Sequence, residues 1–359
     1  MASRNDFIDF LRGSAATIVL FTHLFYACYG PYDPLIHSSI VYKVLYFIAG
    51  LGHAAVIVFF VVSGYLVGGG VVSSVQFQWK EYLIRRLGRL MVVLVPSLLL
   101  TGLWDFTGTA IAGVETYSGL MRDGVGSGPV NYTSDSFVVL LGNLVFLQTI
   151  FVETYGSNGP LWSLAYEFWY YIIFPAAWLC LRRKSVGNLV LVLTVVPVLW
   201  LYNVTILHLF SIWLLGVLVY FVQKKYPILI NSSLRRYRFF VLILFGLSLI
   251  LYRIKVFDIL VLELFIGLSV AAVILLFSDV RAWPKASRFF SNMSFTVYLN
   301  HFYVVAFFYA VFWSKGENLI NSDFDFVLVF MFITVYSYSL YYCFERNTTV
   351  ITKFLRRRL

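Results

Sequence analysis

Charged residues are scarce in this sequence. Asp, Glu, Lys and Arg make up 12% of the 359 residues, whereas about a quarter of the residues in soluble globular proteins are charged. Hydrophobic residues account for 60% and aromatic residues for 19%. These proportions exclude an ordinary soluble protein and predict an all-α, polytopic integral membrane protein with about ten transmembrane helices. We expect residues 1–359 to form a single transmembrane domain with no appended soluble domain.

Cysteine is also rare, and two kinds of motif are missing. Cys28, Cys180 and Cys343 lie far apart in or near apolar segments, which excludes a disulfide framework and any metal-ligand spacing. We therefore expect no metal ion. No small-residue cleavage site follows the first apolar run, so this run is expected to remain as the first span.

Acidic residues are outnumbered by basic ones, 17 to 27, which gives a net charge of +10. In a soluble protein this excess would suggest a nucleic-acid partner. Here Lys and Arg cluster in short segments between apolar runs, a pattern typical of cytoplasmic loops in membrane proteins. We expect the lipid bilayer, and no nucleic acid, as a partner.

The apolar runs predict ten spans, near residues 10–29, 44–70, 88–107, 161–181, 187–204, 207–222, 239–256, 259–278, 293–313 and 324–344. The stretch 137–152 is short and contains Asn143 and Gln148, which favours a re-entrant or interfacial element. With ten spans most basic residues fall on one side, so both termini are expected in the cytoplasm. No internal repeat is evident, which disfavours common transporter architectures.

The first span carries an arginine at its start and a histidine in its middle. Arg12 and His23 are eleven positions apart, or about three helical turns and roughly 16 Å on one face. Ionisable residues in such an apolar segment usually face a bundle interior and mark function. The alternative is that Arg12 is an anchor at the membrane surface and His23 a packing residue.

Two further polar features lie near the predicted cytoplasmic side. Ser63, Gly64 and Tyr65 end the second span, where glycine permits the close approach of a thin ligand or of a neighbouring helix. Three arginines begin the third span: Arg85, Arg86 and Arg89. Arginine binds phosphate oxygens in a planar, bidentate manner, although these residues would also serve as cytoplasmic anchors.

The remaining polar features lie on later spans. Ser163 and Glu167 are one turn apart, and an acid inside an apolar segment must be paired, protonated or functional. Glu263 is a further intramembrane acid, but it stands alone in the sequence. Near the end of the chain, a polar stripe at i, i+4 and i+7 is expected on one helix face: Ser294, Tyr298 and His301.

In this order the segments resemble the motifs of acyltransferase family 3, the bacterial membrane O-acyltransferases that modify cell-surface glycans. DFLRGSAATIVLFTH is similar to the family's opening helix, with Asp9, Arg12 and His23. GHAAVIVFFVVSGYL is similar to its FFxxSGF segment and RRLGRL to its basic loop. GPLWSLAYEFWYY, with Trp162, Ser163 and Glu167, is similar to its WSLxxE segment, and SFTVYLNHF to its serine, tyrosine and histidine. The resemblance covers nearly the whole chain.

The resemblance implies a multi-pass enzyme of the bacterial cytoplasmic (inner) membrane. It would transfer an acyl group, most often acetyl, from acetyl-CoA on the cytoplasmic side to a hydroxyl group on the outer side. The acceptor would be a glycan or a lipid-linked glycan. With no appended domain, the membrane part or an extracytoplasmic partner protein would deliver this acceptor.

The resemblance also implies roles for the candidate residues. His23 is the expected base, because an imidazole titrates near neutral pH, and Glu167 is expected to orient it. Arg12 would orient the thioester or the pantetheine arm, and Tyr298 or Ser63 would donate to the oxyanion. Donor binding is expected at Arg85, Arg86, Arg89, Ser63 and Gly64, and the other candidates are Asp9, Tyr65, Trp162, Ser163, Ser294 and His301. Direct transfer and an acylated enzyme both remain open.

The alternative function is a transporter or flippase for a glycan or a lipid-linked sugar. Its path would be lined by the same polar residues, and no bond would be made. The cytoplasmic arginines distinguish the two functions, because an enzyme that uses coenzyme A needs them and a carrier of neutral sugars does not.

Overall fold

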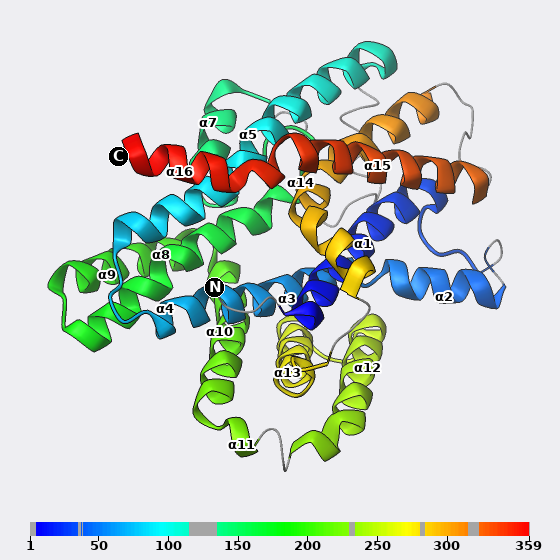
Figure 1. Cartoon of the computed structure of the whole chain (residues 1–359). Coiled ribbons are helices and arrows are strands. Elements are labelled where there is room, and N and C mark those ends of the chain that lie inside the picture. The colour runs from blue at the N-terminus through cyan, green and yellow to red at the C-terminus, as the bar shows by residue number, and fades with distance from the viewer. Residues whose placement is uncertain are drawn as a thin grey trace. The chain divides into compact units, whose positions relative to one another are not determined.

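The computed structural model describes residues 5–34, 37, 39–114, 135–229, 234–280, 284–314 and 323–358. Within these ranges the chain is helical and contains no strand. The elements, of which Figure 1 labels the α-helices, are α1 (Asp6–Tyr29), α2 (Ile40–Ala49), α3 (Gly52–Ser63), the π-helix η1 (Gly64–Gly68), α4 (Gly69–Ser73), α5 (Trp79–Ala112), α7 (Phe137–Leu144), α8 (Leu161–Arg183), α9 (Val186–Tyr202), α10 (Val204–Lys225), α11 (Pro227–Leu229), η4 (Arg235–Tyr237), α12 (Arg238–Ile254), α13 (Ile259–Phe277), α14 (Pro284–Ser314), α15 (Asp323–Cys343), η5 (Glu345–Asn347) and α16 (Thr348–Arg358).

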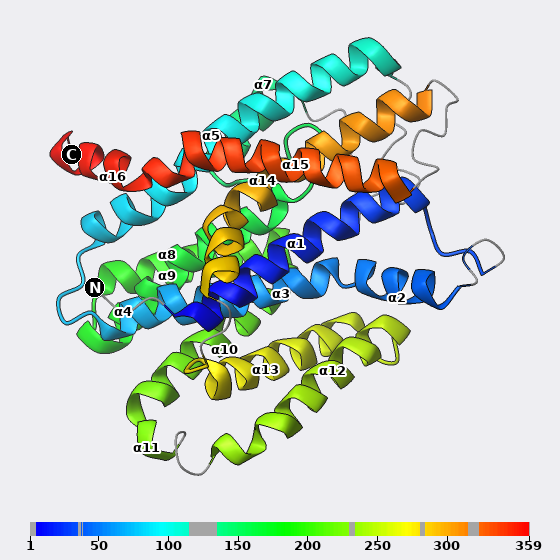
Figure 2. The ribbon, with the colours of Figure 1, turned by 45° about the vertical axis from the view of Figure 1, so that its right-hand side comes forward.

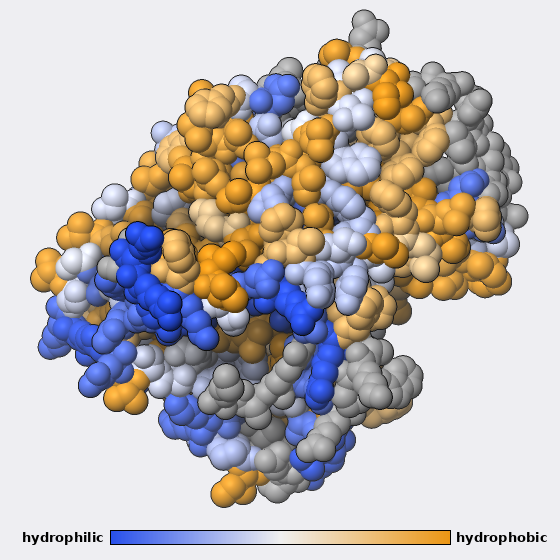
Figure 3. All heavy atoms as spheres, turned by 45° about the horizontal axis from the view of Figure 1, so that its top comes forward, coloured by the Kyte–Doolittle hydropathy of each residue, from blue (hydrophilic) through white to orange (hydrophobic). Residues whose placement is uncertain are grey.

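The helices have the length and composition of membrane spans. In the part of the chain that the structure describes, nine helical segments are long and apolar enough to cross a bilayer, and α9 is a shorter apolar helix. Large apolar side chains are exposed on many of them; Phe239 and Leu99, for example, are 75% and 66% exposed. Figure 3 shows apolar residues over much of one face, with hydrophilic residues gathered towards one end of the view. The prediction of an all-α polytopic membrane protein is confirmed.

One predicted span differs in detail from the observed helices, and the stretch predicted as re-entrant or interfacial contains a short helix. The span expected near 44–70 is interrupted, because α2 ends at Ala49 and α3 begins at Gly52. Gly52 lies against α1, where a Cβ atom would come within 2.7 Å of the Thr22 side chain. In the stretch 137–152, α7 has eight residues, or about 12 Å of helix, which is too short to cross the bilayer.

The chain forms two compact units. The first contains Met1–Ala15, His53–Phe77 and Tyr166–Ser291, and the second contains Ala16–Gly52, Gln78–Ala165 and Asn292–Leu359. In the first unit, α10 packs against η1, α9 and α13, and α12 packs against α13. Figure 2 shows α12 and α13 side by side. In the second unit, α16 packs along α5.

A glycine contact fixes the π-helix of the first unit against α10. A Cβ atom on Gly64 would lie 1.9 Å from the carbonyl oxygen of Trp213, and one on Gly216 would lie 1.9 Å from that of Val61. No side chain fits at either position, so the two backbones meet directly. Trp213 is fully buried beside this contact.

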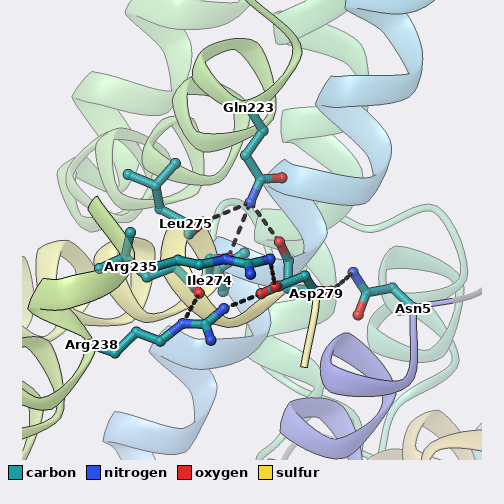
Figure 4. A network of polar contacts seen from close by, with 9 residues as sticks. Asn5, Gln223, Arg235, Arg238, Ile274, Leu275 and Asp279 are labelled. Carbon is teal, nitrogen blue, oxygen red and sulfur yellow. Dashed lines mark hydrogen bonds and ion pairs between the residues drawn. The ribbon is translucent and has the colours of Figure 1, made fainter. Parts of the chain in front are cut away.

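Side chains of neighbouring helices cap the C-terminus of α13 in the first unit (Figure 4). The Gln223 amide donates to the carbonyls of Ile274 and Leu275, both at 3.2 Å. Arg238 Nε donates to the Leu276 carbonyl at 2.8 Å, and Arg235 and Arg238 both pair with Asp279. The last carbonyls of a helix have no intrahelical partner, so these contacts satisfy them and hold α10, α12 and α13 together.

Candidate functional site

Helix α1 carries the first three candidate residues. Asp9 is buried and accepts a hydrogen bond from Ser291 Oγ at 2.8 Å, within the first unit. Arg12 and His23 lie on the same continuous helix, and both are half-buried. The spacing that the sequence predicts for them along the helix, roughly 16 Å, therefore holds.

His23 pairs with the second candidate histidine. In the second unit, His23 Nδ1 lies 2.8 Å from His301 Nε2, and the two rings stack with their centroids 5.1 Å apart. The Phe302 ring meets His23 edge-on at 4.8 Å. His301 is fully buried, and its Nδ1 lies 2.9 Å from the carbonyl oxygen of Val297.

These two contacts fix the tautomers of the neutral imidazoles. A carbonyl oxygen only accepts, so His301 Nδ1 carries a proton and donates it to Val297. His301 Nε2 then has a free lone pair and accepts from His23 Nδ1–H. The lone pair of His23 is consequently on Nε2, which is the arrangement of a general base held by a second group.

The serine and the tyrosine of two later motifs meet in the same unit. Ser163 Oγ lies 2.6 Å from Tyr298 OH, and both side chains are buried. Ser163 also donates to the Pro160 carbonyl at 3.2 Å, so Tyr298 donates to Ser163. The rings of Tyr298 and His301 are 6.3 Å apart. Of the other two candidates in this unit, Ser294 is buried and Trp162 half-buried.

In the first unit, Glu167 accepts two short hydrogen bonds. Ser63 Oγ donates to Glu167 Oε1 at 2.6 Å and Tyr171 OH donates to the same oxygen at 2.5 Å. Trp213 Nε1 donates to Ser63 Oγ at 3.2 Å, beside the close contact of Gly64 with α10. The two hydroxyls hold this carboxylate in one orientation. The two motifs, about a hundred residues apart in the sequence, thus form one polar cluster.

The nearby Tyr65 donates to Gln223 Oε1 at 2.8 Å. Gln223 in turn caps α13. Tyr65 therefore contacts one of the residues that cap the C-terminus of α13 in the first unit.

The three arginines lie on the first turns of α5 in the second unit. Arg85 is exposed, and Arg86 and Arg89 are half-buried. Arg89 lies 3.9 Å from Glu345 and over the Phe295 ring at 6.0 Å. Arg85 lies 3.9 Å from Glu81. Arg85 and Arg89 thus each lie near an acidic side chain.

One polar cluster escaped sequence reasoning. Glu263, which looked isolated in the sequence, lies 2.7 Å from His53 Nε2 and 3.0 Å from His208 Nε2, within the first unit. His53, His208 and Glu263 lie near the starts of α3, α10 and α13, respectively. This shared position near helix starts is the sequence feature that could have linked the three residues. Among the described residues, no group of three His, Cys, Asp or Glu side chains could hold a metal ion.

A second buried network supports the WSLxxE segment. Asn158 Nδ2 donates to the Leu299 carbonyl at 2.9 Å and to Thr101 Oγ1 at 3.2 Å. Asp105 accepts from the backbone and the hydroxyl of Ser157, at 2.7 and 2.6 Å. These bonds fix the turn before α8, and hence the position of Ser163 in the second unit.

Comparison with protein families gives one match that covers nearly the whole chain. The family model described as an acyltransferase domain matches residues 5–345. Neither the curated proteins nor the solved structures give a match.

Proposed function

The chain belongs to acyltransferase family 3, and on this premise we propose that it is a membrane O-acyltransferase that uses acyl-CoA. It transfers an acyl group, which in this family is most often acetyl, from the cytoplasmic donor to a hydroxyl group of an extracytoplasmic glycan or glycolipid. The family does not favour the transporter or flippase alternative, because a carrier makes no bond.

The hydrogen-bonded pair of histidines is the observation that carries this proposal. An acceptor hydroxyl is a weak nucleophile until a base removes its proton. Two successive hydrogen bonds, from His23 to His301 and from His301 to the Val297 carbonyl, leave a lone pair on His23 Nε2. His23 is therefore the proposed general base, and His301 is a positioning residue that acts through it.

In the proposed reaction, the acceptor hydroxyl passes its proton to His23 Nε2 as its oxygen attacks the thioester carbonyl. The new C–O bond forms and a tetrahedral oxyanion develops. The C–S bond then breaks, and the sulfur of coenzyme A takes the proton back from the imidazolium. No oxidant or further reactant is needed, and direct transfer is the simpler of the two open routes.

Tyr298 is the proposed donor to the oxyanion. Its ring lies 6.3 Å from that of His301, and its hydroxyl already donates to Ser163 at 2.6 Å. In this role the hydroxyl turns its proton from Ser163 to the oxyanion as the negative charge develops. Ser63 is the second proposed donor, and its proton would likewise have to leave Glu167.

Glu167 and Arg12 remain proposed catalytic residues on the strength of their motifs. Glu167 accepts from the hydroxyls of Ser63 and Tyr171, which hold its carboxylate in one orientation for the role that its motif implies. Arg12, half-buried on α1, is the proposed guide for the thioester or the pantetheine arm.

The donor site is proposed at the start of α5. Coenzyme A carries phosphates, and Arg85, Arg86 and Arg89 provide guanidinium groups on the surface of the second unit. Guanidinium groups bind phosphates through paired hydrogen bonds. By the positive-inside rule this surface faces the cytoplasm, where acyl-CoA is available.

The test is binding and turnover of acetyl-CoA by the purified protein in detergent, beside His23→Ala and Arg89→Ala. We expect the native protein to bind and slowly hydrolyse the thioester. His23→Ala should keep the affinity and lose turnover, and Arg89→Ala should weaken binding. A native protein with no affinity for any acyl-CoA would refute the proposal at its donor site.

A further inference from the structure

The C-terminal helix α16 follows the region that matches the family and packs along the start of α5. The match ends at residue 345, and α16 runs from Thr348 to Arg358. Figures 1 and 2 both show it beside α5, and a Cβ atom on Gly88 would lie 2.9 Å from the Thr352 side chain. The two helices therefore share one surface of the second unit.

Two arginines, one from each helix, converge on a single oxygen atom. Glu81 Oε2 lies 2.9 Å from Arg356 Nη2 and 3.9 Å from Arg85 Nη1. The side chains of Arg356 and Arg85 are 45% and 53% exposed. The geometry thus already accommodates one oxyanion between two guanidinium groups, in a place that solvent reaches.

The two helix segments that form this surface have many more basic than acidic residues. In the segments 79–90 and 348–358, Glu81 is the sole acidic residue. The basic residues of these segments are Lys80, Arg85, Arg86, Arg89, Lys353, Arg356, Arg357 and Arg358. A concentration of one sign of charge raises the local concentration of anionic ligands.

A second acid anchors α16 without occupying this place. Glu345, buried just before α16, accepts from the backbone and the hydroxyl of Thr296, at 3.2 and 2.6 Å. It also lies 3.9 Å from Arg89. Because Glu345 fixes the start of α16, the ion pair of Arg356 with Glu81 is not needed to hold the helix.

We propose that α16 completes a phosphate-binding surface on α5, in which Arg356 and Arg85 bind a phosphate of the acyl-CoA nucleotide and Glu81 yields its place to it. This inference rests on the proposed function, since it names the donor of the same reaction. A phosphate has more charge and more acceptor oxygens than a carboxylate, so it makes the stronger paired contacts with arginine.

The experiment measures the affinity of coenzyme A and of pantetheine for the full-length protein in neutral detergent, by isothermal titration calorimetry. The variants are Arg356→Gln, Glu81→Gln and, as the matched control, Arg358→Gln. Arg358 belongs to the same last turn but lies over the Phe354 ring at 5.5 Å. Thermal unfolding of each variant shows whether α16 and the fold are retained.

We expect Arg356→Gln to weaken coenzyme A binding about tenfold, the loss of one charge-assisted contact, and to leave pantetheine binding unchanged. Glu81→Gln should tighten coenzyme A binding, because the competing carboxylate charge is gone. Arg358→Gln removes the same charge without the contact to Glu81, so it should weaken binding less than Arg356→Gln does. Coenzyme A binding that is equal in the native protein and in Arg356→Gln would overturn the inference and leave the proposed function intact. If the native protein binds no coenzyme A, the proposed function fails first.

A phospholipid headgroup offers the same phosphate chemistry, so a second measurement separates the two sources. Native mass spectrometry counts phosphatidylglycerol molecules that stay bound to the native protein and to Arg356→Gln. We expect equal counts. A count that falls in the variant while its affinity for coenzyme A is unchanged would assign the surface to lipid and overturn the inference.

Discussion

Replacing His301 should impair catalysis while leaving donor binding intact. In the structure His301 Nε2 accepts from His23 Nδ1 at 2.8 Å, and His301 Nδ1 donates to Val297. His301→Leu removes the acceptor and the donor together. His23 then loses the partner that fixes its tautomer, so Nε2 carries the lone pair in only part of the molecules.

The size of the effect follows from the hydrogen bond that is lost. A donor left without a partner inside the protein costs about 1 to 3 kcal/mol. If about 2 to 3 kcal/mol of this falls on the transition state, kcat drops about 30- to 150-fold. KM for acetyl-CoA should change little, because His301 does not bind the donor in the proposed mechanism.

The assay is steady-state release of free coenzyme A from acetyl-CoA by the purified protein, for the native chain, His301→Leu and His301→Gln. Glutamine can present a side-chain oxygen to His23 Nδ1–H, so His301→Gln should recover part of kcat. If His301 only supported the fold, the two variants would have the same kcat once both are shown to unfold at similar temperatures. Equal kcat for native protein and His301→Leu would refute the reasoning.

Two further predictions concern stability. Gly64→Ala should lower the free energy of unfolding by about 3 kcal/mol, because its Cβ would meet the Trp213 carbonyl at 1.9 Å. The control, Gly70→Ala, has open space around its Cβ and should change the free energy of unfolding little. Equal values for the two variants in denaturant unfolding would contradict this prediction. Glu263→Gln should lower the free energy of unfolding by about 1 to 3 kcal/mol, because it weakens the 2.7 Å contact with His53. It should leave the affinity for acetyl-CoA unchanged. A large loss of this affinity would instead assign Glu263 to the donor site.

Part of the site was accessible from single helices. The spacing of Arg12 and His23 and the stripe of Tyr298 and His301 follow from helical periodicity alone. Periodicity could not identify their partners. His23 and His301 are 278 residues apart, and Ser63 and Glu167 are 104 apart, so each pairing depends on how the helices pack.

The case of Glu263 shows the same limit from the other direction. The sequence presents it as an isolated acid, and in the first unit it contacts His53 and His208, which come from α3 and α10. Likewise, Arg356 lies far from Glu81 in the sequence and still pairs with it, beside Arg85. Such contacts leave no local pattern, because each residue taken separately is consistent with a surface anchor or a packing role.

The sequence by itself determined the class, the approximate positions of the spans and the family of this protein. It does so because a bilayer forces each crossing to be an apolar helix with its backbone bonds internally satisfied, and that requirement is visible in hydropathy. Only the tertiary structure decided which polar groups share a hydrogen bond, and hence which nitrogen of His23 carries the lone pair. Tautomers are set by partners distant in the chain, and helix packing alone brings those partners together.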